Sequence, residues 1–120
     1  MTLRDVRRFA LSLPQATEAP HFHLTSFRVR GRIFATAPPE SDYLHVFLDE
    51  SARHRYLTAE PDFVEILSWG KKAEGLRVIL AAAKAGVVHA MLREAWRAKA
   101  PKRLIKEHDL STGSSAFTQS

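Results

Sequence analysis

The stretch Phe27-Arg28-Val29-Arg30-Gly31-Arg32-Ile33-Phe34-Ala35-Thr36 decides the fold, because it carries the pattern of a β-hairpin. Apolar and charged residues alternate up to Gly31, and an apolar return strand follows. Alternation places Phe27 and Val29 on a buried face. The opposite face receives Arg28, Arg30 and, depending on the turn, Arg32. The turn is either Arg30-Gly31 or Gly31-Arg32, and the register of the strands depends on which is used.

The residues before this hairpin predict a capped helix and then a loop. Thr2 and Asp5 form a pair that resembles a capping box. The apolar residues at helical spacing are Leu3, Val6, Ala10 and Leu13. Pro14 ends this helix. Residues 14–24 contain Pro14 and Pro20 and are expected to form an ordered loop.

After the hairpin, the pattern predicts a third strand and a second helix. Residues 43–48 read as a strand with Leu44, Val46 and Leu48 on one face. Asp49 is the expected cap of a short helix over residues 50–58. The inner side of that helix is expected to carry Ala52, Tyr56 and Leu57.

The second half of the chain predicts another hairpin and a long helix. Residues 63–67 and 76–80 read as strands, joined by a turn over residues 69–75. Pro101 marks the end of the helix, and residues 109–120 are expected to be a flexible tail. The apolar stripe of the helix is Val88, Met91, Leu92, Ala95 and Trp96.

The predicted order is therefore α-β-β-β-α-β-β-α. Short connections force neighbouring strands to pair antiparallel, and amphipathic helices need a sheet face to cover. The expected fold is α+β, a two-layer α/β sandwich with an antiparallel sheet of five strands. Residues 1–108 are expected to form its single domain.

Composition narrows the classes of function. The chain has 120 residues, of which 45% are hydrophobic and 26% charged, as in ordinary globular domains. It contains no cysteine, which excludes disulfides and thiolate metal sites. No apolar leader or membrane-spanning stretch is apparent, so we predict a cytoplasmic protein.

The formal charge of +5 is concentrated in two blocks. Residues 1–36 carry six Arg against two acids, and residues 84–107 carry seven bases against two acids. Residues 37–62 have the opposite balance, with six acids against two Arg. Clustered positive charge is typical of proteins that bind polyanions, although solubility alone also explains a charge of this size.

Three basic segments are candidates for phosphate contacts: the first hairpin, the turn of the second hairpin and the C-terminal block. The alternative for each is structural, as a solvated strand face or as cations that complement a helix dipole. The candidate residues are Arg28, Arg30, Arg32, Lys71, Lys72, Arg77, Arg93, Arg97, Lys99, Lys102 and Arg103. Trp69 is a further candidate, for stacking on a base, but both Trp69 and Trp96 are expected in the core.

Other chemistry has little support. His21 and His23 could chelate one ion, but spacing marks no third ligand, so we expect no metal or other cofactor. The chain lacks a nucleophile elbow and a phosphate-binding glycine loop, so we expect no enzymatic activity. A small-molecule pocket near His21, His23 and Trp69 remains a minor alternative.

The first hairpin, with the residues before it, resembles that of the MmcQ/YjbR family of DNA-binding proteins. Further similar segments lie in order from about residue 3 to residue 104. They are His21–Thr36, Leu44–Asp49, Trp69-Gly70-Lys71 and Ala95–Leu104. The resemblance implies a compact α/β fold, related to secretion-chaperone-like and CyaY-like folds, and a role in binding nucleic acid through two wing hairpins. The chain departs from many relatives in having Trp69 before Lys71 and Lys72, rather than a basic residue shortly before a tryptophan in the penultimate strand.

The leading hypothesis is a non-enzymatic DNA-binding protein that contacts phosphates through its basic hairpins and C-terminal helix. Its affinity is expected to be weak and sensitive to salt, with little sequence preference. The alternative is a protein-interaction module, either chaperone-like or dimerising, that uses an exposed sheet face or edge. No membrane partner is expected.

Overall fold

The computed structural model describes the backbone of residues 1–39 and 41–118 and the side chains of residues 1–39 and 41–111. Its first half contains α1 (Leu3–Ser12), β1 (Ala16–His21), β2 (Leu24–Val29), β3 (Arg32–Ala37), β4 (Tyr43–Val46) and α2 (Glu50–Ala59). Its second half contains β5 (Val64–Trp69), β6 (Lys72–Ile79), the short 3₁₀ helix η1 (Leu80–Ala82), α3 (Ala85–Lys99) and α4 (Lys102–Thr118).

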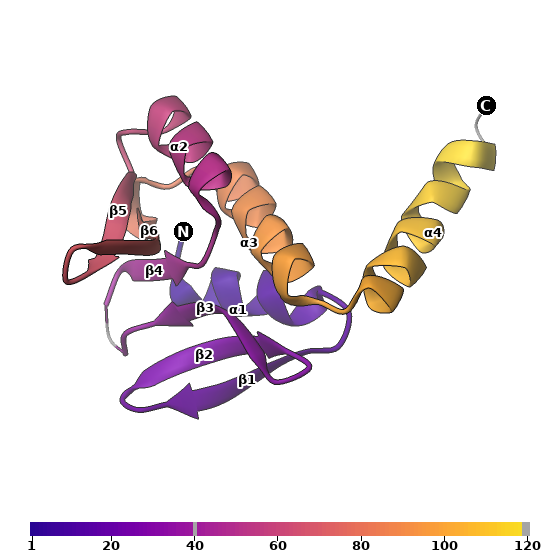
Figure 1. The fold of residues 1–120 in the computed structure, drawn as a ribbon, viewed down its shortest axis with the longest axis horizontal. Helices are drawn as coiled ribbons and strands as arrows, with labels where there is room; N and C mark the ends of the chain where they lie inside the picture. The colour runs from indigo at the N-terminus through magenta and orange to yellow at the C-terminus, as the bar shows by residue number, and fades with distance from the viewer. Residues whose placement is uncertain (40, 119–120) are drawn as a thin grey trace.

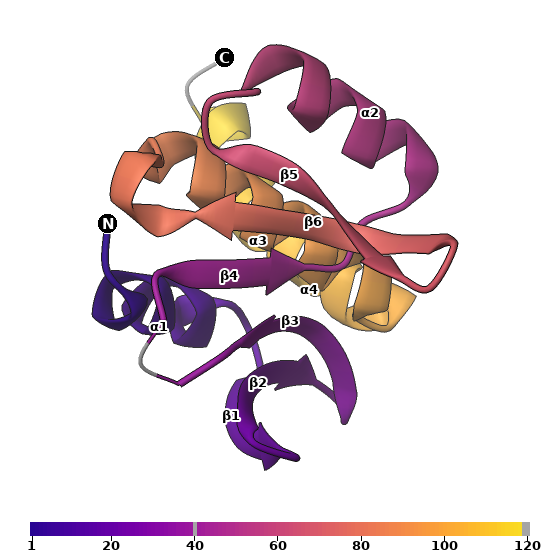
Figure 2. The same cartoon turned by 90° about the vertical axis from the view of Figure 1, so that its left-hand side faces the viewer.

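The six strands form one antiparallel sheet in the order β1-β2-β3-β4-β6-β5. Helices α1 and α3 lie behind the sheet in Figure 2, and α2 lies along the β5 edge. The sheet face toward the viewer in that figure carries no helix among the described residues. The two-layer α+β architecture predicted from sequence is therefore confirmed, with one face of the sheet left open.

The prediction of five strands was wrong, because residues 16–21 form the edge strand β1. Pro14 and Pro20 had indicated a loop there. Pro20 is compatible with this strand because β1 pairs only with β2, and an edge strand tolerates a residue that cannot donate a ladder hydrogen bond. The order of elements accordingly begins with one helix followed by four strands.

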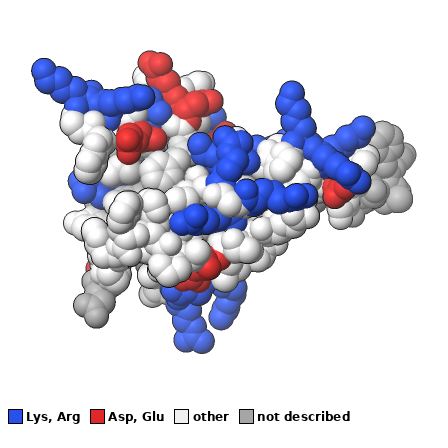
Figure 3. Space-filling view, turned by 60° about the horizontal axis from the view of Figure 1, so that its bottom comes forward, with Lys and Arg blue, Asp and Glu red and all other residues white. Residues whose placement is uncertain are grey.

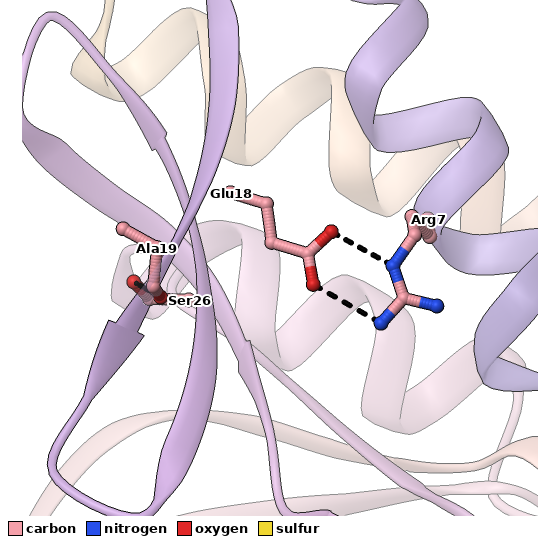
Figure 4. A network of polar contacts seen from close by, with 4 residues as sticks. All are labelled: Arg7, Glu18, Ala19 and Ser26. Carbon is pink, nitrogen blue, oxygen red and sulfur yellow. Dashed lines mark hydrogen bonds and ion pairs between the residues drawn. The ribbon is translucent and has the colours of Figure 1, made fainter.

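Side-chain contacts attach β1 to the rest of the fold (Figure 4). The Arg7 guanidinium on α1 donates two hydrogen bonds to the Glu18 carboxylate, Nε to Oε1 at 2.7 Å and Nη2 to Oε2 at 3.0 Å. Ser26 Oγ on β2 donates to the backbone carbonyl of Ala19 at 2.7 Å. A bidentate pair of this kind fixes orientation as well as distance, so α1 and β1 are held together across the turn that joins them.

The caps of the first two helices are those expected from sequence. Asp5 N donates to Thr2 Oγ1 and Thr2 N donates to the Asp5 carboxylate, which completes the capping box of α1. At α2, the Asp49 carboxylate accepts a hydrogen bond from Ala52 N at 2.9 Å. Ala52 is buried, whereas Tyr56 and Leu57 are only partly buried against the core.

The core lies between α1, α3 and the covered face of the sheet. Every residue of the predicted apolar stripe of α3 is buried, and Trp96 is fully buried. Phe27, Val29 and Leu44 contribute fully buried side chains from the strands. The prediction that Trp96 belongs to the core is therefore confirmed.

The two hairpins predicted from the sequence both have two-residue turns. Val29 pairs with Arg32, so the turn of the first hairpin is Arg30-Gly31, and both residues have positive φ, of 51° and 79°. Such a pair of left-handed residues matches the natural twist of a hairpin. Trp69 pairs with Lys72, so the second turn is Gly70-Lys71 rather than the predicted span over residues 69–75.

The C-terminal segment differs from the sequence prediction. Helix α3 ends at Lys99 before Pro101, as expected, but a further helix, α4, begins at Lys102 and projects from the body of the protein (Figure 1). It includes residues 109–118 of the predicted tail, while residues 119–120 lie outside the described part. The flexibility of this segment stays a prediction. Within the described residues, no helix has the length and apolar character needed to cross a membrane.

Candidate nucleic-acid interface

The open side of the sheet contains a hollow of about 1000 Å³, at the upper end of the usual range for ligand pockets. Its lining comes from both ends of the sheet, because the turn between β1 and β2 and the turn between β5 and β6 point toward the same side of the molecule (Figure 1). Its lining includes His21, Phe22, His23, Thr36, His45, Phe47, Trp69, Lys72, Glu74 and Lys99.

A row of polar side chains crosses the open face, because residues paired across strands share a face. Thr36 pairs with His45, His45 with Arg77, and Arg77 with Glu65. Thr36 Oγ1 lies 3.3 Å from His45 Nδ1, and Arg77 Nη2 donates to Glu65 Oε2 at 2.9 Å. Burial, and secondarily the charge of Arg77, lowers the pKa of His45, so its imidazole is neutral near pH 7.

Two exposed aromatic residues stand at the rim of the hollow. Phe22 is 89% exposed and Trp69 is 78% exposed. Phe22 occupies the turn that joins His21 to Leu24, and Trp69 is the last residue of β5. The expectation that Trp69 lies in the core was wrong, because the tight turn at Gly70 carries the end of β5 beyond the area that the helices cover.

One contact joins two of the predicted basic segments. Arg32 Nη1 donates a hydrogen bond to the backbone carbonyl of Lys99 at 3.2 Å, which places the turn between β2 and β3 against the end of α3. Lys102 and Arg103 follow at the start of α4 and are exposed. Lys99 also lines the hollow, together with Lys72 of the other hairpin. Cations from three separate segments therefore lie in or beside the hollow.

Arg28 and Arg30, and Arg32 for one of the two possible turns, were expected on one strand face, but the observed register separates them. Arg30 lies in the turn, and the pairing of Arg32 with Val29 puts Arg32 on the side of Val29 instead of that of Arg28. Arg28 donates hydrogen bonds to Ser26 Oγ at 2.9 Å and to the carbonyl of Pro20 at 3.3 Å. Its guanidinium thus has structural partners on its own face.

Other predicted cations are held by carboxylates or lie elsewhere. Arg77 pairs with Glu65, Arg97 with Asp109, and Arg103 with Glu107. Arg93 lies over the ring of Phe9 on the α1 side. Figure 3 shows Lys and Arg in several groups on one face, with Asp and Glu between some of them. The eleven predicted residues therefore do not form one continuous patch.

Three histidines contribute to the lining of the hollow. His21 and His23 both line it, as does His45. No group of three or more His, Cys, Asp or Glu residues suited to a metal ion occurs in the part of the chain that the structure describes. Their positions match the minor alternative of a pocket near His21, His23 and Trp69.

Sequence reasoning missed Phe22, Thr36, His45 and Phe47 as site residues. Phe22 had a detectable signal, since it is an aromatic residue between two histidines in a segment expected to be a surface loop. Thr36, His45 and Phe47 had none, because their exposure to the hollow depends on which face of the sheet the helices leave open.

These features define a two-layer α+β protein with an open, concave sheet face. The model of the YjbR family matches residues 11–98, and the chain belongs to that family. The matched region includes both hairpins and ends before Lys99 and α4.

A solved structure supports the fold. The crystal structure of the Deinococcus radiodurans protein DR2400, described with a DUF419 domain, is similar with a TM-score of 0.69 at 21% sequence identity. The similarity covers 79% of this chain and 75% of that chain. At this identity the likeness concerns the fold alone. A search of curated proteins gives no match.

Proposed function

We propose that this protein binds DNA without catalysing a reaction, and that it does so through cations grouped around the hollow. The observation that carries the proposal is the contact between Arg32 and the carbonyl of Lys99, which joins the first basic hairpin to the C-terminal basic block. Lys72 extends the group to the second hairpin, because it lines the same hollow as Lys99. A role of this kind is also what the resemblance to the MmcQ/YjbR family implies.

We expect fewer of the predicted cations to contact phosphates than the sequence suggested. Arg28, Arg77 and Arg97 have partners within the protein, so they would have to exchange those bonds for phosphate contacts. The cations best placed to meet phosphates are Arg30, Arg32, Lys71, Lys72, Lys99 and Lys102, whereas Arg103 would first have to exchange its ion pair with Glu107. Contacts to the backbone of DNA position a protein but carry little sequence information, so binding is expected to be weak and to weaken steeply with salt.

Fluorescence anisotropy with a labelled duplex tests this proposal at two salt concentrations, about 50 mM and about 200 mM. The charge reversal Lys72→Glu with Lys99→Glu is compared with Arg4→Glu with Arg8→Glu, which changes the net charge equally but on α1. We expect the first pair to abolish binding and the second to weaken it only slightly. Absence of wild-type binding at low salt, or equal losses in both double variants, would contradict the proposal.

A protein-interaction module is the second candidate function, and the exposure of Phe22 and Trp69 favours it. Large apolar side chains at the rim of a concave surface are common where a partner chain docks. Sedimentation velocity over a range of concentrations tests the version in which the partner is a second copy. A dimer that dissociates on Phe22→Ser substitution supports this candidate. A monomer at every concentration excludes the version in which the partner is a second copy.

A further inference from the structure

The aromatic rim of the hollow points to a more specific ligand than duplex DNA. We propose that the hollow binds an unpaired stretch of nucleic acid, with one base stacked on the indole of Trp69 and a neighbouring base against the ring of Phe22. This inference rests on the proposed function, because the cations around the hollow are taken to contact the phosphates of the same strand.

The position of the two rings supports this proposal. Each belongs to a two-residue turn or its edge, held by the cross-strand pairs of His21 with Leu24 and of Trp69 with Lys72. Both rings line the same hollow, and most of the surface of each is accessible to solvent. Exposed aromatic rings beside a positively charged groove are the platforms on which proteins stack successive bases of single strands.

The backbone conformation at Phe22 also supports a binding role for its ring. This residue has a φ of 57°, in the left-handed region that bulky side chains rarely adopt. Glycine or asparagine would suit this turn position better. A large aromatic residue that is both strained and almost fully exposed is unfavourable for folding, and such outliers are concentrated at binding sites.

Positive charge lies next to the rings. Lys72 lies directly across the strand pair from Trp69, and Lys71 occupies the turn between them. Lys99 also lines the hollow, and its carbonyl accepts a hydrogen bond from Arg32, which lies beside the hollow and does not line it. Glu74 is the single carboxylate residue among the described residues that line the hollow. A strand with a base on Trp69 would therefore have cations available for the adjoining phosphates.

The floor of the hollow is polar and suits the edges of unpaired bases. The Thr36 hydroxyl and the neutral His45 ring both reach the hollow and lie within hydrogen-bonding distance of each other. Each can exchange this bond for one to a base edge, since a hydroxyl and a neutral imidazole both donate and accept. In a duplex, base faces are stacked and Watson–Crick edges are paired, so neither the rings nor the floor would find partners without opening it.

The test compares one labelled oligonucleotide as a single strand and as a duplex, by anisotropy with the wild type, Trp69→Ala and Trp69→Phe. We expect the wild type to prefer the single strand by about tenfold or more. Trp69→Ala should weaken single-strand binding by about 5-fold to 150-fold, the loss of one stacked base, and leave duplex binding unchanged. Trp69→Phe should restore much of the affinity. The control is Leu11→Ala, which changes an exposed apolar residue on α1, away from the hollow. This variant should bind as the wild type does.

Intrinsic fluorescence gives a second readout, because Trp96 is fully buried and Trp69 is mostly exposed. Unlabelled single strand should quench the emission of the wild type, and the quenching should disappear in Trp69→Phe. Binding to neither form of DNA would remove the proposed function itself. Equal affinity for both forms, with Trp69→Ala indistinguishable from the wild type, would overturn the stacking site and leave phosphate binding intact. Loss of a dimer on Trp69→Ala, without an effect on DNA binding, would assign the rim to a protein contact instead.

Discussion

Arg32 and Lys99 are separated by 67 positions in sequence, yet Arg32 Nη1 donates a hydrogen bond to the backbone carbonyl of Lys99 at 3.2 Å. This carbonyl belongs to the last residue of α3, where backbone acceptors have no partner within the helix. A cation at that end also complements the helix dipole. One guanidinium therefore stabilises the end of α3 and keeps two basic segments together.

The first prediction concerns the charge of Arg32. Arg32→Ala should weaken duplex binding and lower the slope of log affinity against log salt by about 1, the value for one lost phosphate contact. Arg32→Lys should retain most of the slope, because it keeps the positive charge. Anisotropy titrations at several salt concentrations measure the slope, with Arg4→Ala on α1 as the control for net charge. An unchanged slope in Arg32→Ala would exclude Arg32 from the interface.

Local sequence patterns were sufficient to predict much of the fold. The alternation around Gly31 predicted the first hairpin, Thr2 and Asp49 predicted helix caps, and the stripe ending at Trp96 predicted α3. In each case the deciding interaction joins residues a few positions apart or follows from a regular apolar period. Such signals survive in the sequence because they do not depend on the rest of the fold.

The features that were missed depend on contacts between distant residues. Strand β1 has no apolar alternation, and it is held by pairing with β2 and by the bond between Arg7 and Glu18. Helix α4 was expected to be a tail in its second half, but Leu104 is buried against the core and Arg97 of α3 pairs with Asp109. Neither contact can be inferred from local propensity.

In the candidate site, too, local features could be predicted from the sequence and contacts between distant residues could not. The number of cations in each segment is visible in the sequence, but their partners depend on strand register. Arg77 meets Glu65 because β5 and β6 pair in the observed register, and a shift by one residue would place the two on opposite faces. The exposure of Trp69 likewise depends on where the turn at Gly70 begins.

The second prediction concerns Gly75 of β6, which lies close to the end of the neighbouring strand β4. A Cβ atom at this position would lie 2.5 Å from the backbone oxygen of Val46. Gly75→Ala should therefore shift the paired strands and destabilise the protein by about 1–3 kcal/mol. Urea denaturation measures the change. Gly86→Ala is the matched control, since a Cβ there meets nothing within 4 Å and should be neutral or stabilising by up to about 1 kcal/mol.

The third prediction uses the contrast between the two tryptophans. Trp96 is fully buried and its Nε1 donates to the carbonyl of Pro14 at 3.0 Å, which ties α3 to the chain after α1. Trp96→Phe removes this donor and part of the buried volume, so we expect a loss of about 2–4 kcal/mol in the free energy of unfolding. Denaturation is followed by circular dichroism, because the substitution removes a fluorophore. Trp69→Phe should change stability by less than about 0.5 kcal/mol, and equal effects would contradict the assignment of core and rim.

The fourth prediction concerns the pH dependence that His45 imposes on stability. Burial, with a smaller contribution from Arg77, lowers the pKa of His45 below its ordinary value of 6.5. At pH values between the lowered pKa of the folded state and the ordinary pKa of the unfolded state, the unfolded chain binds more protons than the folded protein. The stability of the fold therefore rises with pH in this window. The contribution of His45 is complete above 6.5 and is lost as the pH falls through the lowered pKa. The midpoint of urea denaturation should therefore decrease as the pH falls from about 7.5 to about 5.

Substitution of His45 isolates this contribution from those of the other histidines. His45→Gln removes the titrating ring and keeps an amide that can bond to the Thr36 hydroxyl, so the midpoint should change less with pH than in the wild type. His54→Gln is the control, because His54 is exposed on α2, and it should keep the wild-type dependence. If His45→Gln and the wild type lose stability in parallel, the imidazole on the floor of the hollow is not held in its neutral form, and its assigned role as both donor and acceptor for a base edge fails with it.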